Sequence, residues 1–276
     1  MQFDFEQRAR PVIKWAGGKS GLLEQIIPLL PSDFEGYFEP FLGGAAAFLS
    51  LSQMRHAVLG ELNPELYNLY TVVRDRCAEL TAHLEDFQVR YSESFYYELR
   101  AQDTGDDVYL AARTIFLNKT CFNGLYRQNS KGKFNVPFGH RTQCPTLYSA
   151  DNLFEVAERL SRASLLNLDF EQVIQRAGPN DLVYCDPPYE PLSKSSSFNA
   201  YTQLGFSQSE QVRLKEACEA AVGRGATVAL SNSSAPFILE LYSGWPIHRI
   251  QARRAINSNA SRRGVIDEVL VLMTST

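Results

Sequence analysis

The sequence predicts an α/β fold whose sheet domain is interrupted by an inserted, mainly helical domain. Short apolar runs of strand composition alternate with amphipathic stretches at both ends of the chain. From about Cys77 to Leu147 this alternation stops, and amphipathic helices lead into a polar segment rich in Asn, Gly and Lys, residues 123–139. We therefore predict a discontinuous sheet domain, 1–75 with 150–276, and an inserted domain, 76–149, that contains a hairpin or an exposed loop.

The first half of the sheet is predicted from four elements. Residues 36–41 and 57–59 have the composition of short strands. Residues 44–53 and 64–75 are predicted helices, and Asn63 has the side chain expected of an N-cap for the second of them.

The second half follows the insert. Strands are predicted at 164–168, 181–185 and 226–230, with a helix at 209–222. Two further strands, 247–252 and 265–273, are expected to form a terminal hairpin.

The composition is typical of a soluble globular protein. The chain has 276 residues, of which 45% are hydrophobic and 21% charged. No apolar run approaches the roughly 20 residues that cross a bilayer, and the amino terminus lacks the features of a signal peptide, so a cytoplasmic location is expected. The five cysteines have no paired spacing, so neither a disulfide framework nor a metal site is predicted.

The charge is unevenly distributed. The net charge is −4, yet two long stretches contain no acidic residue. Such stretches are typical of surfaces that face phosphates, although a solvated polar face would have the same composition. Their basic residues are Arg113, Lys119, Arg127, Lys131, Lys133 and Arg141 in the first, and Arg249, Arg253, Arg254, Arg262 and Arg263 in the second.

The most informative motif is Asp186-Pro187-Pro188-Tyr189, directly after the apolar run 181–185. Each proline fixes φ near about −65° and removes an N–H, so the Asp186 carboxylate and the Pro187 carbonyl can accept the two N–H groups of a planar amine. The lone pair of the amine nitrogen is then drawn out of conjugation with the aromatic base that carries the amine, and Tyr189 can stack on that base. This pattern favours methyl transfer to an exocyclic amine; the alternative is a proline-rich turn after a buried strand.

Other candidate ligand residues also follow predicted strands, where open α/β sheets bind their ligands. Gly43 and Gly44 allow a tight turn and close approach of the backbone. Glu61 lies where a carboxylate can bind ribose hydroxyls. Asp169 and Phe170 can supply a polar contact and a stacking ring for an adenine, although Asp169 is also a natural helix N-cap.

The run 14–20 ends in Gly-Lys-Ser but is not a nucleotide phosphate loop. A Walker A loop needs a glycine five residues before Gly18, and that residue is Ile13.

Five segments together resemble the DNA adenine methyltransferase (Dam) family of N6-adenine enzymes: Lys14 to Lys19, Phe38 to Gly44, Asn123 to Arg127, Phe134 to Gly139 and Asp186 to Tyr189. Their order is similar to the alpha arrangement of amino-methyltransferases. The stretches 191–198 and 201–206 are similar to the restriction-modification branch that protects GATC sites. The resemblance implies a Rossmann-like S-adenosylmethionine-dependent methyltransferase sheet.

The resemblance also implies the roles of individual residues. Catalysis would involve Asp186, Pro187, Pro188 and Tyr189. The cofactor S-adenosylmethionine would contact Trp15, Ala16, Gly17, Lys19, Glu39, Pro40, Phe41, Gly43, Gly44, Ala45, Glu61, Asp169, Phe170 and Asp186. Double-stranded DNA would contact Lys14, Asn123, Leu125, Arg127, Asn129, Lys131, Lys133, Pro137, Arg262 and Arg263, and Arg127 suits bidentate pairing with guanine. A cognate restriction endonuclease is a further partner that this branch implies.

Two positions depart from the family pattern. Glu61 replaces the aspartate usual at the ribose position, which lengthens the side chain by one methylene. Leu168 stands where relatives often have glycine before the Asp-Phe pair.

Three alternatives stay open at this stage. The same acceptor geometry would serve N4-cytosine methylation of DNA. The fold could belong to a DNA-binding regulator without turnover, or to an enzyme that methylates RNA or a protein amide.

Overall fold

The computed structural model describes residues 9–51, 54–102, 104–192, 206–253 and 265–275. Strands alternate with helices before α3 (Pro64–Asp75) and from β3 (Ala163–Leu166) to β6 (Ile247–Arg253), so the predicted α/β fold is confirmed. By packing, the chain divides into two compact units. The first consists of Met1–Gly18, Gly43–Ser52 and Glu61–Asn167, and the second of Lys19–Leu42, Gln53–Gly60 and Leu168–Thr276.

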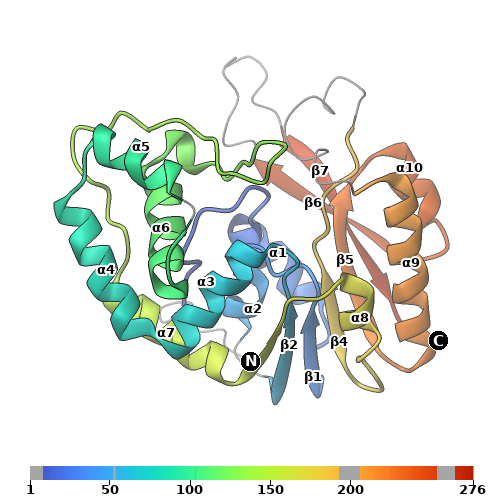
Figure 1. Cartoon of the computed structure of the whole chain (residues 1–276). Helices are drawn as coiled ribbons and strands as arrows, with labels where there is room; N and C mark the ends of the chain where they lie inside the picture. Colours follow the sequence, from blue (N-terminus) through green and yellow to red (C-terminus); the bar gives the residue numbers. More distant parts are fainter. Residues whose placement is uncertain (1–8, 52–53, 103, 193–205, 254–264, 276) are drawn as a thin grey trace. The chain divides into compact units, whose positions relative to one another are not determined.

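Six strands of the second unit pair in the order β2-β1-β4-β5-β7-β6 (Figure 1). They are β1 (Gly36–Glu39), β2 (His56–Gly60), β4 (Leu182–Cys185), β5 (Thr227–Ser233), β6 (Ile247–Arg253) and β7 (Val265–Met273). Strands β2, β1, β4 and β5 run parallel, and β7 is antiparallel to both β5 and β6. The carboxyl ends of the four parallel strands therefore meet at one edge, where sheets of this kind bind ligands.

The central strands of this unit are buried along their whole length. All residues of β1 and β4 are buried, a pattern typical of parallel strands that are covered on both faces. Helix α9 (Gln208–Gly223) contributes Leu214 and Cys218 to the core that also holds Val183 and Leu230. The other helices of the unit are short: η1 (Lys19–Gly21), α1 (Leu23–Ile26), η2 (Ile27–Leu29), α8 (Phe170–Ile174) and α10 (Pro236–Leu241).

The first unit is mainly helical. Its elements are α2 (Ala46–Ser50), α3 (Pro64–Asp75), α4 (Cys77–Val89), α5 (Glu93–Ala101), α6 (Asp107–Thr120), η3 (Phe122–Gly124), α7 (Ala150–Ser161) and β3 (Ala163–Leu166). Helix α6 is the central one, since 10 of its 14 residues are buried. The predicted cap of α3 is confirmed: Asn63 Oδ1 accepts from the backbone N–H of Glu65 at 2.9 Å.

Among the predicted elements that are shorter than expected, two have a clear local reason. The first strand ends at Glu39, because Pro40 has no N–H to donate to a neighbouring strand. The helix expected from Gly44 begins only at Ala46, because Ala45 adopts a left-handed conformation with φ 59°.

The predicted terminal hairpin is confirmed. Strands β6 and β7 pair antiparallel from Ile247 with Val271 to Arg253 with Val265. The polar segment 123–139 forms no regular ladder. Two isolated antiparallel bridges, Gln128 with Phe134 and Cys121 with Phe138, hold it as an ordered loop. The division into domains 1–75 with 150–276 and 76–149 stays a prediction.

All five cysteines are unpaired; Cys144 is half-buried and the other four are buried. None of the helices in the described part of the chain combines the length and the apolar composition needed to cross a membrane.

Candidate functional site

The Asp186–Tyr189 turn follows β4 in the second unit and is built around an ion pair. Asp186 Oδ1 lies 2.8 Å from Lys19 Nζ, and the Lys19 side chain is only 3% exposed. Burial raises the pKa of Asp186, and the adjacent ammonium group of Lys19 opposes that rise. Two of the predicted site residues, Asp186 and Lys19, therefore lie in one cluster, with a carboxylate oxygen beside a buried ammonium group.

Tyr189 contacts the same cluster. Lys19 Nζ lies 4.6 Å from the centroid of the Tyr189 ring. The Tyr189 hydroxyl donates to Glu268 Oε2 at 2.8 Å, and this oxygen is 3.9 Å from Lys19 Nζ. Burial raises the pKa of Tyr189, with further contributions from the charges of Asp186 and Glu268, so the hydroxyl stays a hydrogen-bond donor. Glu268 thus holds Tyr189 through its hydroxyl group, and the ammonium group of Lys19 contacts the Tyr189 ring.

Two buried polar residues anchor the turn. Gln211 Nε2 donates to the Pro188 carbonyl at 3.0 Å, and Asn232 Nδ2 donates to Gln211 Oε1 at 3.1 Å. Asn232 Oδ1 accepts from the N–H of Glu190 at 3.2 Å. Gln211 and Asn232 are fully buried, so these bonds satisfy groups that would otherwise destabilise the fold.

Sequence analysis missed Gln211, Asn232 and Glu268. The signal was present, because Asn232 and Glu268 each interrupt an apolar strand pattern. Gln211 precedes Leu214 and Cys218 by three and seven residues, so it lies on the apolar face of its helix. Such an interruption is typical of a buried polar group with a specific partner.

Four further predicted cofactor residues of the second unit are Glu39, Pro40, Phe41 and Phe170. At the end of β1, Glu39 is 2% exposed and accepts from the Tyr37 hydroxyl at 2.7 Å. After Pro40, the Phe41 ring stacks on Phe170 with centroids 5.3 Å apart, and Phe206 packs edge-on against Phe41 at 5.7 Å. Phe41 and Phe170 thus lie together in an aromatic cluster.

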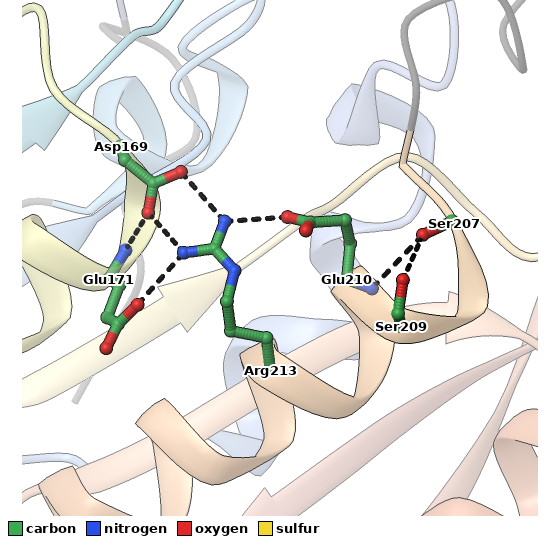
Figure 2. A network of polar contacts seen from close by, with 6 residues as sticks. All are labelled: Asp169, Glu171, Ser207, Ser209, Glu210 and Arg213. Carbon is green, nitrogen blue, oxygen red and sulfur yellow. Dashed lines mark hydrogen bonds and ion pairs between the residues drawn. The ribbon is translucent and has the colours of Figure 1, made fainter.

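Asp169 is both a helix cap and the partner of an arginine. Its Oδ1 accepts from the N–H of Glu171 at 3.0 Å, so the N-cap that was weighed as an alternative is confirmed. Both carboxylate oxygens also accept from Arg213, at 2.8 and 2.9 Å (Figure 2). These bonds lower the pKa of Asp169.

Two predicted cofactor residues of the first unit, Gly43 and Gly44, lie against Trp15. Gly43 has φ +48°, and a Cβ on it would lie 2.8 Å from Trp15 Nε1. A Cβ on Gly44 would lie 3.0 Å from Trp15 Cβ. Glycine is therefore needed at this turn for both its conformation and its size. Ala16 and Gly17 are exposed, and Ala45 is buried.

Glu61 holds the backbone of this turn. Its Oε2 accepts from the N–H of Gly43 at 2.9 Å, and its Oε1 accepts from the N–H of Asn63 at 2.8 Å. Burial raises the pKa of Glu61 to about 7, although both hydrogen bonds favour the ionised form. The glutamate that departs from the family pattern thus reaches two backbone donors.

The predicted DNA-reading residues of the first unit are all exposed: Lys14, Asn123, Leu125, Arg127, Asn129, Lys131, Lys133 and Pro137. Along the same loop, Tyr126, Phe134, Val136 and Phe138 are buried. This alternation fixes the loop by its apolar side chains and directs the polar ones outward. Arg127 Nε donates to Asn135 Oδ1 at 2.7 Å across the loop.

Lys14 is brought to the same loop by Asn118. Asn118 Oδ1 accepts from the Lys14 N–H, and Asn118 Nδ2 donates to the Lys14 carbonyl, both at 2.8 Å. The same Nδ2 contacts the Gly124 carbonyl at 3.3 Å. Trp15 packs on Tyr126 with centroids 4.9 Å apart. The motifs at residues 14–15 and 123–127 therefore lie together, whereas Arg262 and Arg263 lie outside the described residues.

Comparison with known proteins identifies the family. A family model described as D12 class N6 adenine-specific DNA methyltransferase matches residues 15–256. The chain belongs to this family.

Three relatives match it over nearly their whole length. The Type II methyltransferase M1.LlaDCHI of Lactococcus lactis subsp. cremoris is 40% identical over 270 residues, which cover 95% of this chain and 94% of the relative. The Type II methyltransferase M.MjaIII of Methanocaldococcus jannaschii is 39% identical over 275 residues, 92% of this chain and 95% of the relative. The DNA adenine methylase of Escherichia coli (strain K12) is 34% identical over 270 residues, 96% of each.

The methyltransferase is thus an adenine-specific DNA-modifying enzyme that needs a methyl donor. The match favours adenine over N4-cytosine as the target, and an enzyme over a regulator without turnover. Within the second unit, the methyltransferase presents the Asp186 carboxylate, a buried lysine and an anchored tyrosine at the edge of the sheet where folds of this kind bind ligands.

Proposed function

We propose that this methyltransferase transfers a methyl group from S-adenosylmethionine to N6 of a flipped adenine in duplex DNA, within the sequence GATC. The observation that supports this most is the cluster of Asp186, Lys19 and Tyr189 directly after β4. It combines a carboxylate acceptor beside an ammonium group with an aromatic ring, which are the groups that a planar exocyclic amine requires.

The residues present fit S-adenosylmethionine as the donor. Each Glu61 oxygen accepts one backbone N–H and keeps capacity for a ribose hydroxyl. Gly43, which has no side chain, allows the backbone to approach a ligand. Asp169 and the aromatic pair Phe41 and Phe170 suit a purine ring with an amino group. The donor supplies a methyl group on a sulfonium that a nitrogen lone pair can displace.

The chain's own residues would prepare the adenine for attack. A duplex hides N6, so the base is flipped out at an unstacking cost of a few kcal/mol. Asp186 and the Pro187 carbonyl accept the two N–H groups of N6, which directs the lone pair out of the ring. The Lys19 ammonium group opposes the rise in the pKa of Asp186 that burial causes, and Tyr189 stacks on the base. The methyl group passes directly to nitrogen, so no cysteine nucleophile is needed.

Sequence recognition is proposed for the loop 123–139 of the inserted domain, 76–149. Arg127 would pair with guanine O6 and N7, and Lys14, Asn123, Leu125, Asn129 and Pro137 would contact other base edges. Lys131 and Lys133 would contact phosphates, as would Arg262 and Arg263. These assignments are supported by the exposure of the loop residues and by Asn118, which is hydrogen-bonded to both Lys14 and Gly124.

The substitution Arg127→Ala is expected to relax sequence choice at one guanine. The loss of a bidentate contact should reduce discrimination at that position by about 1–3 kcal/mol. Methylation rates on duplexes with single base changes would measure this. The matched control is Lys131→Ala, which should weaken binding to every sequence alike. An unchanged site preference in Arg127→Ala would refute the proposed role.

The test of the whole function is to express the protein in cells that lack adenine methylation and to map modified bases across the genome by single-molecule sequencing. N6-methyladenine confined to GATC would support the chemistry and the site together. N6-methyladenine in another sequence would keep the chemistry and refute the recognition assignment. The absence of any DNA modification would favour another substrate.

A cognate endonuclease is the proposed partner, because two of the relatives are named type II methyltransferases. Genomic DNA from the expressing cells should then resist endonucleases that adenine methylation of GATC blocks. Full cleavage of that DNA would argue against a protective role.

A further inference from the structure

Arg213 gathers three carboxylates around one guanidinium group. Its Nη1 donates to Asp169 Oδ1 at 2.8 Å and to Glu171 Oε2 at 2.9 Å. Its Nη2 donates to Asp169 Oδ2 at 2.9 Å and to Glu210 Oε2 at 2.6 Å (Figure 2). The contact with Asp169 is bidentate, so it fixes the plane of that carboxylate as well as its position.

The same guanidinium group covers the residue next to Asp169. Arg213 Cζ lies 4.1 Å from the centroid of the Phe170 ring. Phe170 is 5% exposed and stacks on Phe41 with an interplanar angle of 26°. One side chain on α9 therefore orients both neighbouring residues at the start of α8.

Stability alone gives little reason for this arrangement. The side chains of Arg213, Asp169, Glu171 and Glu210 are each between 32 and 40% exposed. Ion pairs with this exposure are screened by water and contribute little to stability. Orientation is what a bidentate contact adds, because it restricts the carboxylate to one geometry.

One oxygen of the Asp169 carboxylate can accept a further hydrogen bond. Oδ1 accepts both from Glu171 N–H and from Arg213. Among the described residues, Oδ2 accepts from Arg213 alone, so it keeps capacity for a second donor. The hydrogen bonds from Arg213 lower the pKa of Asp169, so this oxygen accepts hydrogen bonds throughout the neutral range. A fixed acceptor beside an aromatic ring distinguishes an amino group from a carbonyl on a flat ligand.

We propose that Arg213 is a positioning residue that orients Asp169 and Phe170 toward the adenine ring of the methyl donor, and that it thereby makes the enzyme selective for an adenine over a 6-oxopurine. This inference rests on the proposed function, in which the donor is S-adenosylmethionine. Arg213 does not itself contact the purine; it acts on the purine by positioning Asp169 and Phe170.

The test compares two ligands whose purines carry an amino group or an oxo group at position 6; the 6-oxopurine also carries a proton on N1. Titration calorimetry would measure the binding of S-adenosylhomocysteine and S-inosylhomocysteine to the wild-type enzyme, Arg213→Met and Arg213→Lys. The wild type should prefer the adenosyl ligand by about tenfold or more, since the inosyl carbonyl cannot donate to Asp169. In Arg213→Met this preference should fall toward one. Arg213→Lys keeps the charge without the planar fork and should give an intermediate preference.

Two control variants separate orientation from general stability. Lys215 lies on the same helix and pairs with Glu219 at 2.6 Å, so Lys215→Met removes a comparable ion pair. Glu210→Gln removes one carboxylate of the cluster and leaves the bidentate contact with Asp169. Both variants should keep the wild-type selectivity, whatever the change in their thermal unfolding midpoints.

Unchanged selectivity in Arg213→Met and Arg213→Lys would overturn the inference, even if both unfold at a lower temperature. Should Arg213→Met fail to fold, the comparison of wild type with Arg213→Lys decides alone. A wild-type enzyme that methylates DNA but binds neither ligand would instead overturn the proposed donor, and the inference with it.

Discussion

Asp186→Asn is expected to lower kcat by about 10³ while DNA binding stays near the wild-type value. The asparagine has nearly the same shape but carries no charge, so it accepts an N–H of adenine more weakly. It also leaves Lys19 beside a neutral group where an ion pair of 2.8 Å stood. Single-turnover methylation of a cognate duplex would measure the chemical step, and fluorescence anisotropy would measure DNA affinity.

Asp181→Asn is the matched control, because Asp181 stands immediately before the same strand. Asp181 Oδ1 accepts from Gly36 N–H at 2.9 Å, and Oδ2 accepts from Gly178 N–H at 2.8 Å. The control variant should therefore lose about 1–3 kcal/mol of stability and keep its kcat. If Asp186→Asn kept nearly full activity, or if Asp181→Asn lost as much, Asp186 would have no special role in the chemistry.

The fold was predictable because local patterns determine it. The apolar run before Asp186 could only be a buried strand of an α/β sheet, and the run became β4 with all four residues buried. The Asp-Pro-Pro-Tyr motif then had to lie at the carboxyl end of that strand. In the same way, Asn63 before Pro64 predicted a helix start that the structure confirms.

The partners of the site residues were not predictable in this way, because strand register decides them. Glu268 reaches Tyr189 across 79 residues of sequence. It does so because β7 is antiparallel to β5 and pairs Ser233 with Glu268, which places the beginning of β7 at the edge where the parallel strands end. The sequence predicted a terminal hairpin but gave no information about the pairing of β7 with β5.

The same limit applies to Arg213. Its position in an amphipathic helix predicts an exposed side chain, and it is about one-third exposed. That it pairs with Asp169 depends on how α8 and α9 pack, which no local pattern specifies.

The pH dependence of stability should change measurably when Glu61 is replaced by glutamine. Glu61 is 9% exposed, and burial raises its pKa from 4.5 to about 7. The folded state therefore binds this proton more tightly than the unfolded state does. The stabilisation that results is complete below the unfolded pKa and is lost as the pH rises through about 7. The shift corresponds to on the order of 3 kcal/mol.

Chemical unfolding of the wild type and of Glu61→Gln between pH 5 and pH 9 would measure this difference. Glutamine can accept one of the two backbone N–H groups but cannot titrate, so the variant should lack the loss of stability that the wild type shows near pH 7. The difference between the two curves is the relevant quantity, because all other titrating groups are shared. Parallel curves across this range would contradict the raised pKa.

Donor binding should depend on pH in the opposite direction, because ribose hydroxyls would donate to the ionised form of Glu61. Binding then lowers the pKa of Glu61 and releases its proton, so affinity rises as the pH increases toward 7 and levels off above it. The dissociation constant of S-adenosylhomocysteine should fall by up to about tenfold between pH 6 and pH 8 in the wild type and stay constant in Glu61→Gln. A pH-independent affinity in the wild type would remove Glu61 from the ribose site, while its hydrogen bonds to Gly43 and Asn63 would still explain its burial.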